Sequence, residues 1–296
     1  MGGAVGGTLG ILIPPSVILV VYAISTEQNI VKLFMAALIP GLMAASFYIL
    51  VISWLARRNP DAMPVQPALP WSERLRLLAA VWPSILIAVV VVGGIYGGIF
   101  TPTEAAAVGA VAVLADGIIR RALDWQGFRD ALRQSAETCG MIFMILLGAE
   151  IFNGFLALTQ LPTNAAMAIA GWGLPPYLVL VALLAFYILL GAVMDELAMI
   201  LLTLPVFFPI VTALDFGMPS DEVAIWFGIL VLIVVGIGLV APPIGLNVFV
   251  ISAIARQIPI TDIYKGVIPF VGADIVRLTL CVMFPSLSLW MVRLLT

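Results

Sequence analysis

Histidine is absent from this 296-residue sequence, and charged residues make up only 10% of it. Histidine is the commonest metal ligand and general base near neutral pH, so its absence excludes a Ser-His triad and a histidine-ligated zinc site. The two cysteines, Cys139 and Cys281, stand in separate apolar segments without metal-ligand or disulfide spacing, and we expect both to be small buried side chains. A net charge of −3 without a long basic run gives no indication of nucleic-acid binding.

Hydrophobic residues, by contrast, make up 63% of the chain, and its mean hydropathy is +1.21. Soluble domains contain roughly 45–50% apolar residues. The apolar runs 31–55, 78–100 and 223–240 approach or exceed the roughly 20 residues that cross a bilayer core as a helix. Because backbone groups in lipid must be satisfied within the chain, these runs predict an all-α, polytopic membrane protein.

Most of the 13 lysines and arginines lie in two short polar segments. The first contains Arg57, Arg58, Arg74 and Arg76, and the second contains Arg120, Arg121, Arg129 and Arg133. Cytoplasmic loops are enriched in Lys and Arg, so both segments are predicted to be cytoplasmic. Two apolar segments lie between them and return the chain to the same side. Continued along the chain, this pattern makes the acidic stretch 215–222 and the C-terminus extracytoplasmic, with 266–294 as the last crossing.

A pattern of glycine followed by two prolines occurs twice in the chain. Gly10 precedes Pro14-Pro15, and Gly238 precedes Pro242-Pro243, each within an apolar run and each followed by an Ile-Pro pair at a similar distance. Under the predicted topology the first copy runs outward and the second inward, so the two copies form an inverted repeat. Inverted repeats with interrupted helices are typical of secondary transporters. The alternative is a pair of proline kinks in ordinary spans.

Each break is expected to expose oxygen atoms inside the membrane. Proline lacks an amide donor and cannot continue a helix, which frees backbone carbonyls. Gly245 allows a sharp turn at the second break, and Asn247 adds a side-chain amide. Ser16 adds a hydroxyl at the first break. Hard oxygen ligands in a dry pocket favour a cation such as Na⁺, whereas a hydrogen bond between helices is the alternative role for Ser16 and Asn247.

An acidic pair, Asp195-Glu196, separates two apolar segments of the stretch 175–214. The stretch forms either a re-entrant hairpin or two full spans, and we favour the hairpin because Gly191 is the only turn former near its tip. Ionisable residues within a membrane are functional candidates, so Asp195 is the first candidate to neutralise a bound cation. The pair would also suit acid-base catalysis, but no second carboxylate motif accompanies it, and we do not expect an enzyme.

The remaining intramembrane charges suggest structural roles. Thr101 and Glu104 have the spacing of an N-terminal capping box and mark a helix start. Asp116 and Glu137 are expected at the interface near the arginine-rich segments. The deeper charges are expected to form ion pairs between spans, and they are Glu150, Asp274 and Arg277.

Four segments together resemble the large membrane subunit of tripartite ATP-independent periplasmic (TRAP) transporters, which is called DctM-like. They read GGTLGILIPPSVILVVYA, GIFTPTEAAAVGAV, GAVMDELAMILLTLPVFFPI and FGILVLIVVGIGLVAPPIGLNVFV, and the likeness extends over essentially the whole chain. The resemblance implies an elevator-type Na⁺-coupled symporter of the bacterial or archaeal cytoplasmic (inner) membrane. It also implies a small membrane subunit (DctQ-like) and a periplasmic solute-binding protein that delivers organic acids such as C4-dicarboxylates or sialic acid.

The resemblance also implies two Na⁺ sites and no other cofactor. The first site lies around Ile13, Pro15 and Ser16. The second brings the hairpin tip against the second break, and its residues are Gly191, Met194, Asp195, Ala241, Pro243, Gly245 and Asn247. Ala241 stands where the family usually has threonine, so only its backbone carbonyl remains as a ligand. No substrate-binding residue follows from the sequence.

The resemblance further divides the chain into three parts. Residues 1–29 hold the end of a first hairpin and the first broken helix, and 30–134 hold connecting or scaffold helices. Residues 135–296 form the second repeat, with a re-entrant hairpin at about 175–214 and a second broken helix at about 223–256. The chain would thus begin where the first hairpin ends. Besides a Na⁺-driven organic-acid permease, an inactive or split-gene fragment that acts only in assembly with its other half is therefore an alternative.

Overall fold

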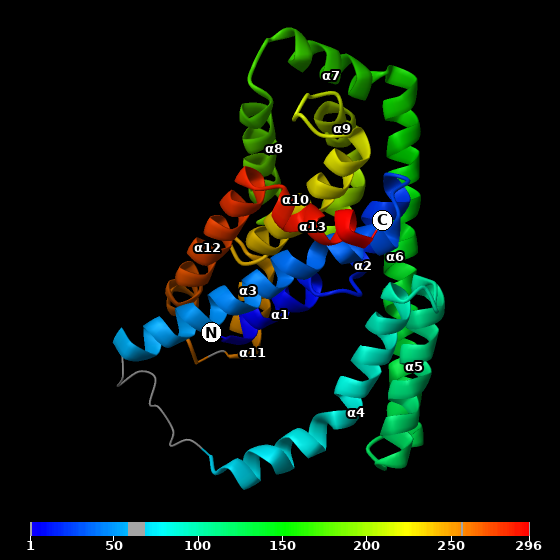
Figure 1. Ribbon diagram of the computed structural model, residues 1–296, viewed down its shortest axis with the longest axis vertical. Helices are drawn as coiled ribbons and strands as arrows, with labels where there is room; N and C mark the ends of the chain where they lie inside the picture. The colour runs from blue at the N-terminus through cyan, green and yellow to red at the C-terminus, as the bar shows by residue number, and fades with distance from the viewer. Residues whose placement is uncertain (1, 59–68, 256, 296) are drawn as a thin grey trace. The chain divides into compact units, whose positions relative to one another are not determined.

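The computed structural model describes residues 2–58, 69–255 and 257–295, and over these residues all regular secondary structure is helical (Figure 1). In chain order the helices are α1 (Gly2–Leu12), α2 (Val17–Ser25), α3 (Ile30–Arg58), α4 (Trp71–Tyr96), α5 (Pro102–Ile119), α6 (Trp125–Thr159), α7 (Leu161–Gly171), α8 (Pro176–Gly191), α9 (Glu196–Thr212), α10 (Ser220–Gly238), α11 (Leu246–Ile254), α12 (Ile260–Met283) and α13 (Ser286–Leu295). Within the described part, six are long and apolar enough to cross a membrane, namely α3, α4, α5, α6, α10 and α12. The prediction of an all-α, polytopic membrane protein is confirmed.

The chain forms two compact units. The larger unit comprises Met1–Ser53 and Met144–Thr296, and the smaller comprises Trp54–Phe143. The long helices α3 and α6 each begin in one unit and end in the other.

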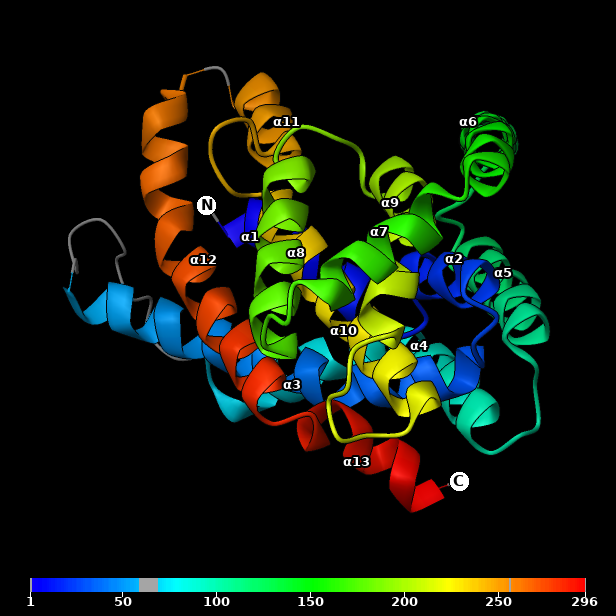
Figure 2. The ribbon, with the colours of Figure 1, turned by 90° about the horizontal axis from the view of Figure 1, so that it is seen from above.

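Helix α10 is the core of the larger unit. Every residue from Val223 to Gly238 is buried, and helices α8, α9, α12, α13 and the short helices α1 and α2 pack around it (Figure 2). A helix that is apolar on all sides is stable only when it is surrounded. Tyr22 of α2 makes a specific contact with it, since its hydroxyl donates a 2.7 Å hydrogen bond to the Ala224 carbonyl.

Local sequence signals explain several helix starts. Thr101 caps α5: its hydroxyl accepts a hydrogen bond from the Glu104 amide, and the Glu104 carboxylate accepts one from the Thr101 amide at 2.8 Å. This capping box is the predicted one and is confirmed. Pro102 and Pro176 occupy the first positions of α5 and α8, where a missing amide donor costs nothing.

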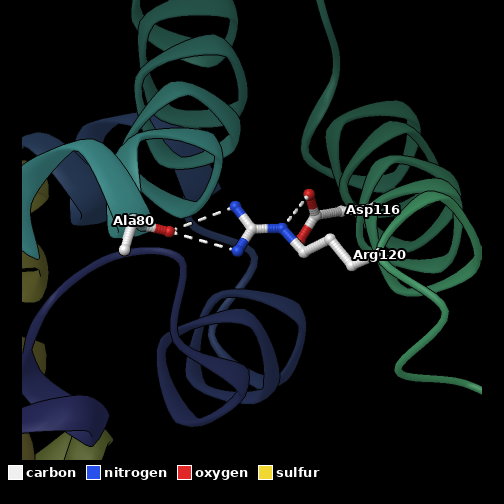
Figure 3. A network of polar contacts seen from close by, with 3 residues as sticks. All are labelled: Ala80, Asp116 and Arg120. Atoms are coloured by element: carbon white, nitrogen blue, oxygen red, sulfur yellow. Dashed lines mark hydrogen bonds and ion pairs between the residues drawn. The ribbon is translucent and has the colours of Figure 1, made fainter.

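In the smaller unit, α5 packs against α4 and is fastened to it by one arginine (Figure 3). The Nη1 and Nη2 atoms of Arg120 both donate to the Ala80 carbonyl at 3.1 Å, while Nε donates to Asp116 at 2.9 Å. The Ala80 carbonyl lies one turn before Pro83, which interrupts the amide ladder in this part of α4. Asp116 and Glu137, expected at the interface, thus pair within their own helices, the latter with Arg133.

The predicted last crossing needs correction. It is not one span over 266–294, because α12 ends at Met283 and α13 begins at Ser286. Pro285 explains the break, since the residue before a proline avoids helical geometry. Helix α13 instead packs against α10, where Arg293 forms an ion pair with Glu222. This contact agrees with the predicted topology, in which both residues lie on the extracytoplasmic side.

Ion pairs between spans were also expected, and the structure shows a different arrangement. Asp274 and Arg277 pair with each other at 2.9 Å within α12. Their link to another helix is a hydrogen bond of 2.6 Å that the Tyr48 hydroxyl on α3 donates to Asp274. Glu150 makes no ion pair with any described residue. The reason is spacing: residues three apart on a helix lie on one face, so the two charges meet without a second span.

The two cysteines also differ from each other. Cys281 is buried as predicted, but Cys139 is exposed, so that prediction is wrong for Cys139. Cys139 lies on the part of α6 where neighbouring residues are exposed, because few described side chains pack there.

Candidate functional site

Three interruptions of helical structure lie in the larger unit. Helices α1 and α2 flank a break at 13–16, α8 and α9 flank the hairpin tip at 192–195, and α10 and α11 flank a break at 239–245. Helix α1 packs against both α10 and α11, and α8 packs against α10. Between them lies a cavity of about 350 Å³, lined by Gly7, Ile11, Asp195, Glu196, Leu239, Leu246, Asn247, Val250 and Ile251.

The second break turns at a glycine in the left-handed region. Gly245 has φ +56° and precedes the first turn of α11. A Cβ atom there would lie 3.0 Å from the Ala241 carbonyl oxygen. The sequence prediction that Gly245 permits a sharp turn and a close backbone approach is confirmed. A backbone hydrogen bond spans the break: the backbone N–H of Asn247 donates to the Leu239 carbonyl at 3.1 Å. The Pro14-Pro15 and Pro242-Pro243 peptide bonds of the two breaks are both cis.

A backbone hydrogen bond joins the hairpin tip to the second break. The Gly245 amide donates to the Ala192 carbonyl at 3.2 Å. One turn away, α8 and α10 cross at Gly191 and Gly238, where a Cβ atom on Gly238 would lie 2.7 Å from the Gly191 Cα atom. Glycine at both positions allows this approach, which holds the start of the hairpin tip against the end of α10.

Asp195 is the N-cap of α9. Its Oδ1 atom accepts hydrogen bonds from the amides of Leu197 at 3.0 Å and Ala198 at 3.4 Å. Capping carboxylates satisfy amides that have no partner within the helix. Both bonds use the same oxygen, so Oδ2 stands outside the cap. Asp195 therefore has a local structural role in addition to its position at the cavity.

Ser16 has the opposite character, because its hydroxyl has no local role. It occupies the N-cap position of α2 but forms no side-chain cap hydrogen bond. The residue is 4% exposed, and its Oγ atom has no hydrogen-bond partner among the described residues. A buried hydroxyl without a partner costs free energy, so an unpartnered Ser16 Oγ suggests a ligand at the first break.

A tyrosine hydroxyl contacts two of the carbonyl oxygens at the second break. The Tyr264 hydroxyl, from α12, lies 2.5 Å from the Ile244 carbonyl and 3.1 Å from the Pro243 carbonyl. The sequence pattern did not indicate this contact, since the residues are about 20 positions apart and no motif connects them. The Pro243 carbonyl, a predicted ion ligand, thus already accepts a hydrogen bond.

The cavity combines two carboxylates with two helix N-termini. Asp195 and Glu196 lie at the first turn of α9, and Leu246 and Asn247 lie at the first turn of α11. Helix N-termini favour anions, because their first amides are free of helical partners and the helix dipole is positive there. Carboxylates favour cations. The arrangement suits an anion and a cation held side by side.

The predicted site residues divide into two groups. Asp195 and Asn247 line the cavity, whereas the other predicted residues do not: Ile13, Pro15, Ser16, Gly191, Met194, Ala241, Pro243 and Gly245. They lie in the breaks and in the hairpin around it. Sequence reasoning missed the apolar wall, formed by Gly7 with Ile11 on α1 and by Leu246 with Val250 on α11. Their spacing of four residues is the signal for a shared helix face.

Comparison with protein families gives one match over nearly the whole chain. Residues 3–287 match the family described as the Tripartite ATP-independent periplasmic transporter, DctM component.

Individual relatives carry the same kind of name. The C4-dicarboxylate TRAP transporter large permease protein DctM of Pseudomonas aeruginosa is 35% identical over 285 residues, which cover 96% of this chain and 64% of that protein. The isethionate TRAP transporter permease protein DctMQ of Oleidesulfovibrio alaskensis is 31% identical, over 97% of this chain and 44% of that protein. The sialic acid TRAP transporter large permease protein SiaM of Vibrio cholerae is 30% identical, over 95% and 64%. The chain thus spans less than two thirds of the length of these relatives.

Proposed function

Because this chain belongs to the DctM component family of tripartite ATP-independent periplasmic transporters, we propose that it acts as the large permease part of a Na⁺-coupled importer of organic acids. The family consists of transporter components and not of enzymes. The observation that carries the proposal is the cavity of about 350 Å³ at which two broken helices and a hairpin tip converge. Secondary transporters bind their ions and substrates at such sites.

One Na⁺ site is proposed at each break. At the first, the buried and unpartnered Ser16 Oγ is joined by backbone oxygens of Ile13 and Pro15. At the second, the tip residues Gly191, Met194 and Asp195 face a further set from the break, which consists of Ala241, Pro243, Gly245 and Asn247. The Gly245 to Ala192 hydrogen bond supports this pairing, because it ties the tip to the break. Asp195 would supply the negative charge that a bound cation requires.

The organic acid is proposed to bind in the cavity between these ions. The positive dipole ends of α9 and α11 would attract its carboxylate, as half-helix N-termini do in other transporters, although the amides of Leu197, Ala198 and Asn247 already donate within the chain. The P. aeruginosa and V. cholerae relatives are named for C4-dicarboxylate and sialic acid. A cargo of this class fits the positive helix ends, and the bound cations would offset the charges of Asp195 and Glu196.

We also propose that α8 and α9 form a re-entrant hairpin in an inverted-repeat, elevator-type fold. With 16 and 17 residues, the helices are about 24–26 Å long, which is less than a hydrocarbon core of about 30 Å. The two Pro-Pro breaks support the repeat, because α1 before the first and α11 after the second both line the cavity. A mobile body built from both repeats would carry ions and cargo together across the membrane.

The proposed transporter has two further components. These are a small DctQ-like membrane subunit and a periplasmic solute-binding protein that delivers the organic acid, all acting at the cytoplasmic (inner) membrane. The relative named DctMQ supports the first partner, since its name joins both membrane components in one protein.

Uptake into vesicles tests this function. The chain is reconstituted with its small subunit and binding protein, and uptake of radiolabelled succinate and of sialic acid is measured with and without an inward Na⁺ gradient. We expect Na⁺-dependent uptake of at least one acid. Uptake that requires only a proton gradient would contradict Na⁺ coupling, and no uptake with any acid would favour a role in assembly alone.

Replacement of Asp195 tests the ion site. Asp195→Asn keeps an acceptor oxygen for the α9 cap but removes the charge, so the Na⁺ concentration for half-maximal uptake should rise at least about tenfold, which corresponds to about 1.4 kcal/mol. Asp215→Asn, in the exposed loop before α10, is the matched control and should leave it unchanged. An Asp195→Asn transporter with wild-type Na⁺ dependence would remove Asp195 from the site.

A further inference from the structure

An apolar groove follows the turn between α5 and α6 in the smaller unit. Its volume is about 690 Å³, and its walls include Gly109, Val113 and Gly117 of α5 and Phe128 and Leu132 of α6. A second cavity of about 290 Å³ continues it toward the turn, because the two share Leu114, Leu123 and Phe128. Together the two cavities form one continuous groove between α5 and α6, which we call the α5–α6 groove.

The α5–α6 groove is apolar along its length and open to its surroundings. Val113 is 60% exposed and Leu132 is 55% exposed, although both line it. Gly109 and Gly117 are closely packed, because an added Cβ atom would lie 3.2 Å from Val91 Cγ2 and 3.3 Å from Leu123 Cβ, respectively. Such a surface in a membrane-spanning segment needs an apolar occupant, because neither water nor a polar ligand would satisfy it.

The charges at the mouth of the groove indicate what that occupant carries. Arg121 and Arg129 flank the lining residues Ala122 and Phe128. Neither guanidinium forms an ion pair or hydrogen bond with a described residue, whereas Arg120 and Arg133 next to them are paired with Asp116 and Glu137. Two guanidinium groups that are sequence neighbours of lining residues therefore have no partner among the described residues.

Two carboxylates, Asp124 and Asp130, stand close in sequence, but neither forms an ion pair with Arg121 or Arg129 among the described residues. Asp124 lines the smaller cavity, but its Oδ1 atom accepts a 2.7 Å hydrogen bond from the Gly127 amide at the start of α6. Trp125 is 73% exposed there and lines the same cavity. Exposed tryptophan and unpaired arginine are the residues that mark the headgroup level of a bilayer.

We propose that the α5–α6 groove binds an anionic phospholipid of the inner leaflet, with an acyl chain along Val113 and Leu132 and the phosphate between Arg121 and Arg129. A phospholipid matches both features at once, since it joins an apolar chain to an anionic head. Basic pockets between helices on the cytoplasmic side bind such headgroups. An apolar protein segment would fill the groove but leave both arginines uncompensated.

Lipid binding to the purified full chain tests the proposal. Native mass spectrometry is used to titrate the detergent-solubilised protein with dioleoyl phosphatidylglycerol and, separately, with dioleoyl phosphatidylcholine. We expect phosphatidylglycerol to bind more tightly. Arg121→Gln with Arg129→Gln should weaken its binding about 25-fold, since each arginine near a lipid surface contributes about fivefold. Arg57→Gln with Arg58→Gln removes the same charge elsewhere and should have no effect.

A second pair of variants tests the groove itself. Ala131→Trp places a large ring inside it, whereas Ala136→Trp places the same ring on a different face of α6. The first should abolish tight phosphatidylglycerol binding and the second should not, with Ser135→Leu as a milder filling variant if Ala131→Trp lowers the yield of folded protein. Equal binding of both lipids, or arginine or groove variants that bind as the wild type does, would overturn the proposal.

Discussion

At the scale of single residues, the cavity in the larger unit depends on glycines where any side chain would collide with backbone. Gly245 has φ +56°, and a Cβ atom added to it would lie 3.0 Å from the Ala241 carbonyl oxygen. Gly191 and Gly238 let α8 and α10 touch. A non-glycine residue in the left-handed region costs roughly 1–2 kcal/mol, so these positions are narrowly restricted.

Gly245→Ala should therefore lower the free energy of unfolding by about 1–2 kcal/mol. The measurement is a thermal melt of the detergent-purified protein. Gly272→Ala is the matched control, because Gly272 lies in α12 and a Cβ atom added there would have nothing within 4 Å, and alanine is the better helix former by up to about 1 kcal/mol. A Gly245→Ala protein as stable as the Gly272→Ala protein would contradict the close approach at the break.

Asn247 is the amide that lines the cavity beside Asp195. Asn247→Ala should raise the Na⁺ concentration needed for half-maximal uptake, because a neutral oxygen ligand is lost, and the effect should be smaller than that of Asp195→Asn. Asn164→Ala, on the exposed α7, serves as the control in the same vesicle assay. If Asn247→Ala left Na⁺ dependence intact and changed only the half-saturating acid concentration, the amide would belong to the organic-acid site instead.

At the scale of helices, a buried polar group links α3 to α12. Asp274 and Arg277 are 2% and 1% exposed, and Tyr48 reaches them from a position 226 residues away in sequence. Helix α3 follows the first break and α12 follows the second, so the link connects corresponding parts of the proposed repeat. A buried ion pair of this kind is costly to break because the remaining charge is left without a partner.

Tyr48→Phe should destabilise the protein by about 1–3 kcal/mol, since it removes a donor to a buried carboxylate and keeps the ring. Tyr177→Phe is its control, because the Tyr177 ring packs on Phe216 and Trp226 and its hydroxyl has no hydrogen bond with the described residues. The readout is the urea or thermal midpoint in detergent. Equal midpoints for the two variants would mean that the hydroxyl does not stabilise Asp274.

Arg277→Met alone should cost more, about 3–5 kcal/mol, because it leaves Asp274 charged and buried. Arg277→Met combined with Asp274→Leu should recover most of that loss, since the double variant leaves no charge behind. The same thermal melts measure both. A double variant less stable than Arg277→Met would show that the pair contributes net stability through its mutual attraction.

At the scale of the whole molecule, one ion pair joins two segments that the predicted topology places on the same side of the membrane. Arg293 of α13 meets Glu222 at the start of α10 with two hydrogen bonds, of 2.9 Å and 2.5 Å. The C-terminal helix and the acidic loop 215–222 therefore share one side of the larger unit. The arginines at 120–133 are predicted to lie on the other side of the membrane.

Cysteine labelling in intact cells checks this topology. In a background with Cys139→Ser and Cys281→Ala, a membrane-impermeant maleimide should label Asp221→Cys and Leu294→Cys but not Gln126→Cys. Permeabilised cells provide the control, since all three should then react. Labelling of Leu294→Cys only after permeabilisation would place the C-terminus in the cytoplasm and contradict the predicted number of crossings.

Several features of this protein follow from its sequence alone, because they depend on composition or on neighbours in the chain. Apolar runs near the length of a bilayer span predict a polytopic helical protein, and six such helices are present in the described part. Paired prolines end a helix in any surroundings, so the breaks after Leu12 and Gly238 were predictable. The same holds for the Thr101–Glu104 cap, which involves residues three apart.

Contacts between distant residues were settled by tertiary packing. The Tyr264 hydroxyl donates a hydrogen bond to the Pro243 carbonyl, and the Tyr48 hydroxyl donates one to Asp274. The Ser16 hydroxyl has no partner among the described residues. None of these contacts has a sequence signature, because the central helix α10 is apolar on every side and its pattern does not indicate which neighbour each face meets. The rotation and tilt of each helix, set by side chains such as the Gly191–Gly238 pair, decide which oxygens surround the cavity.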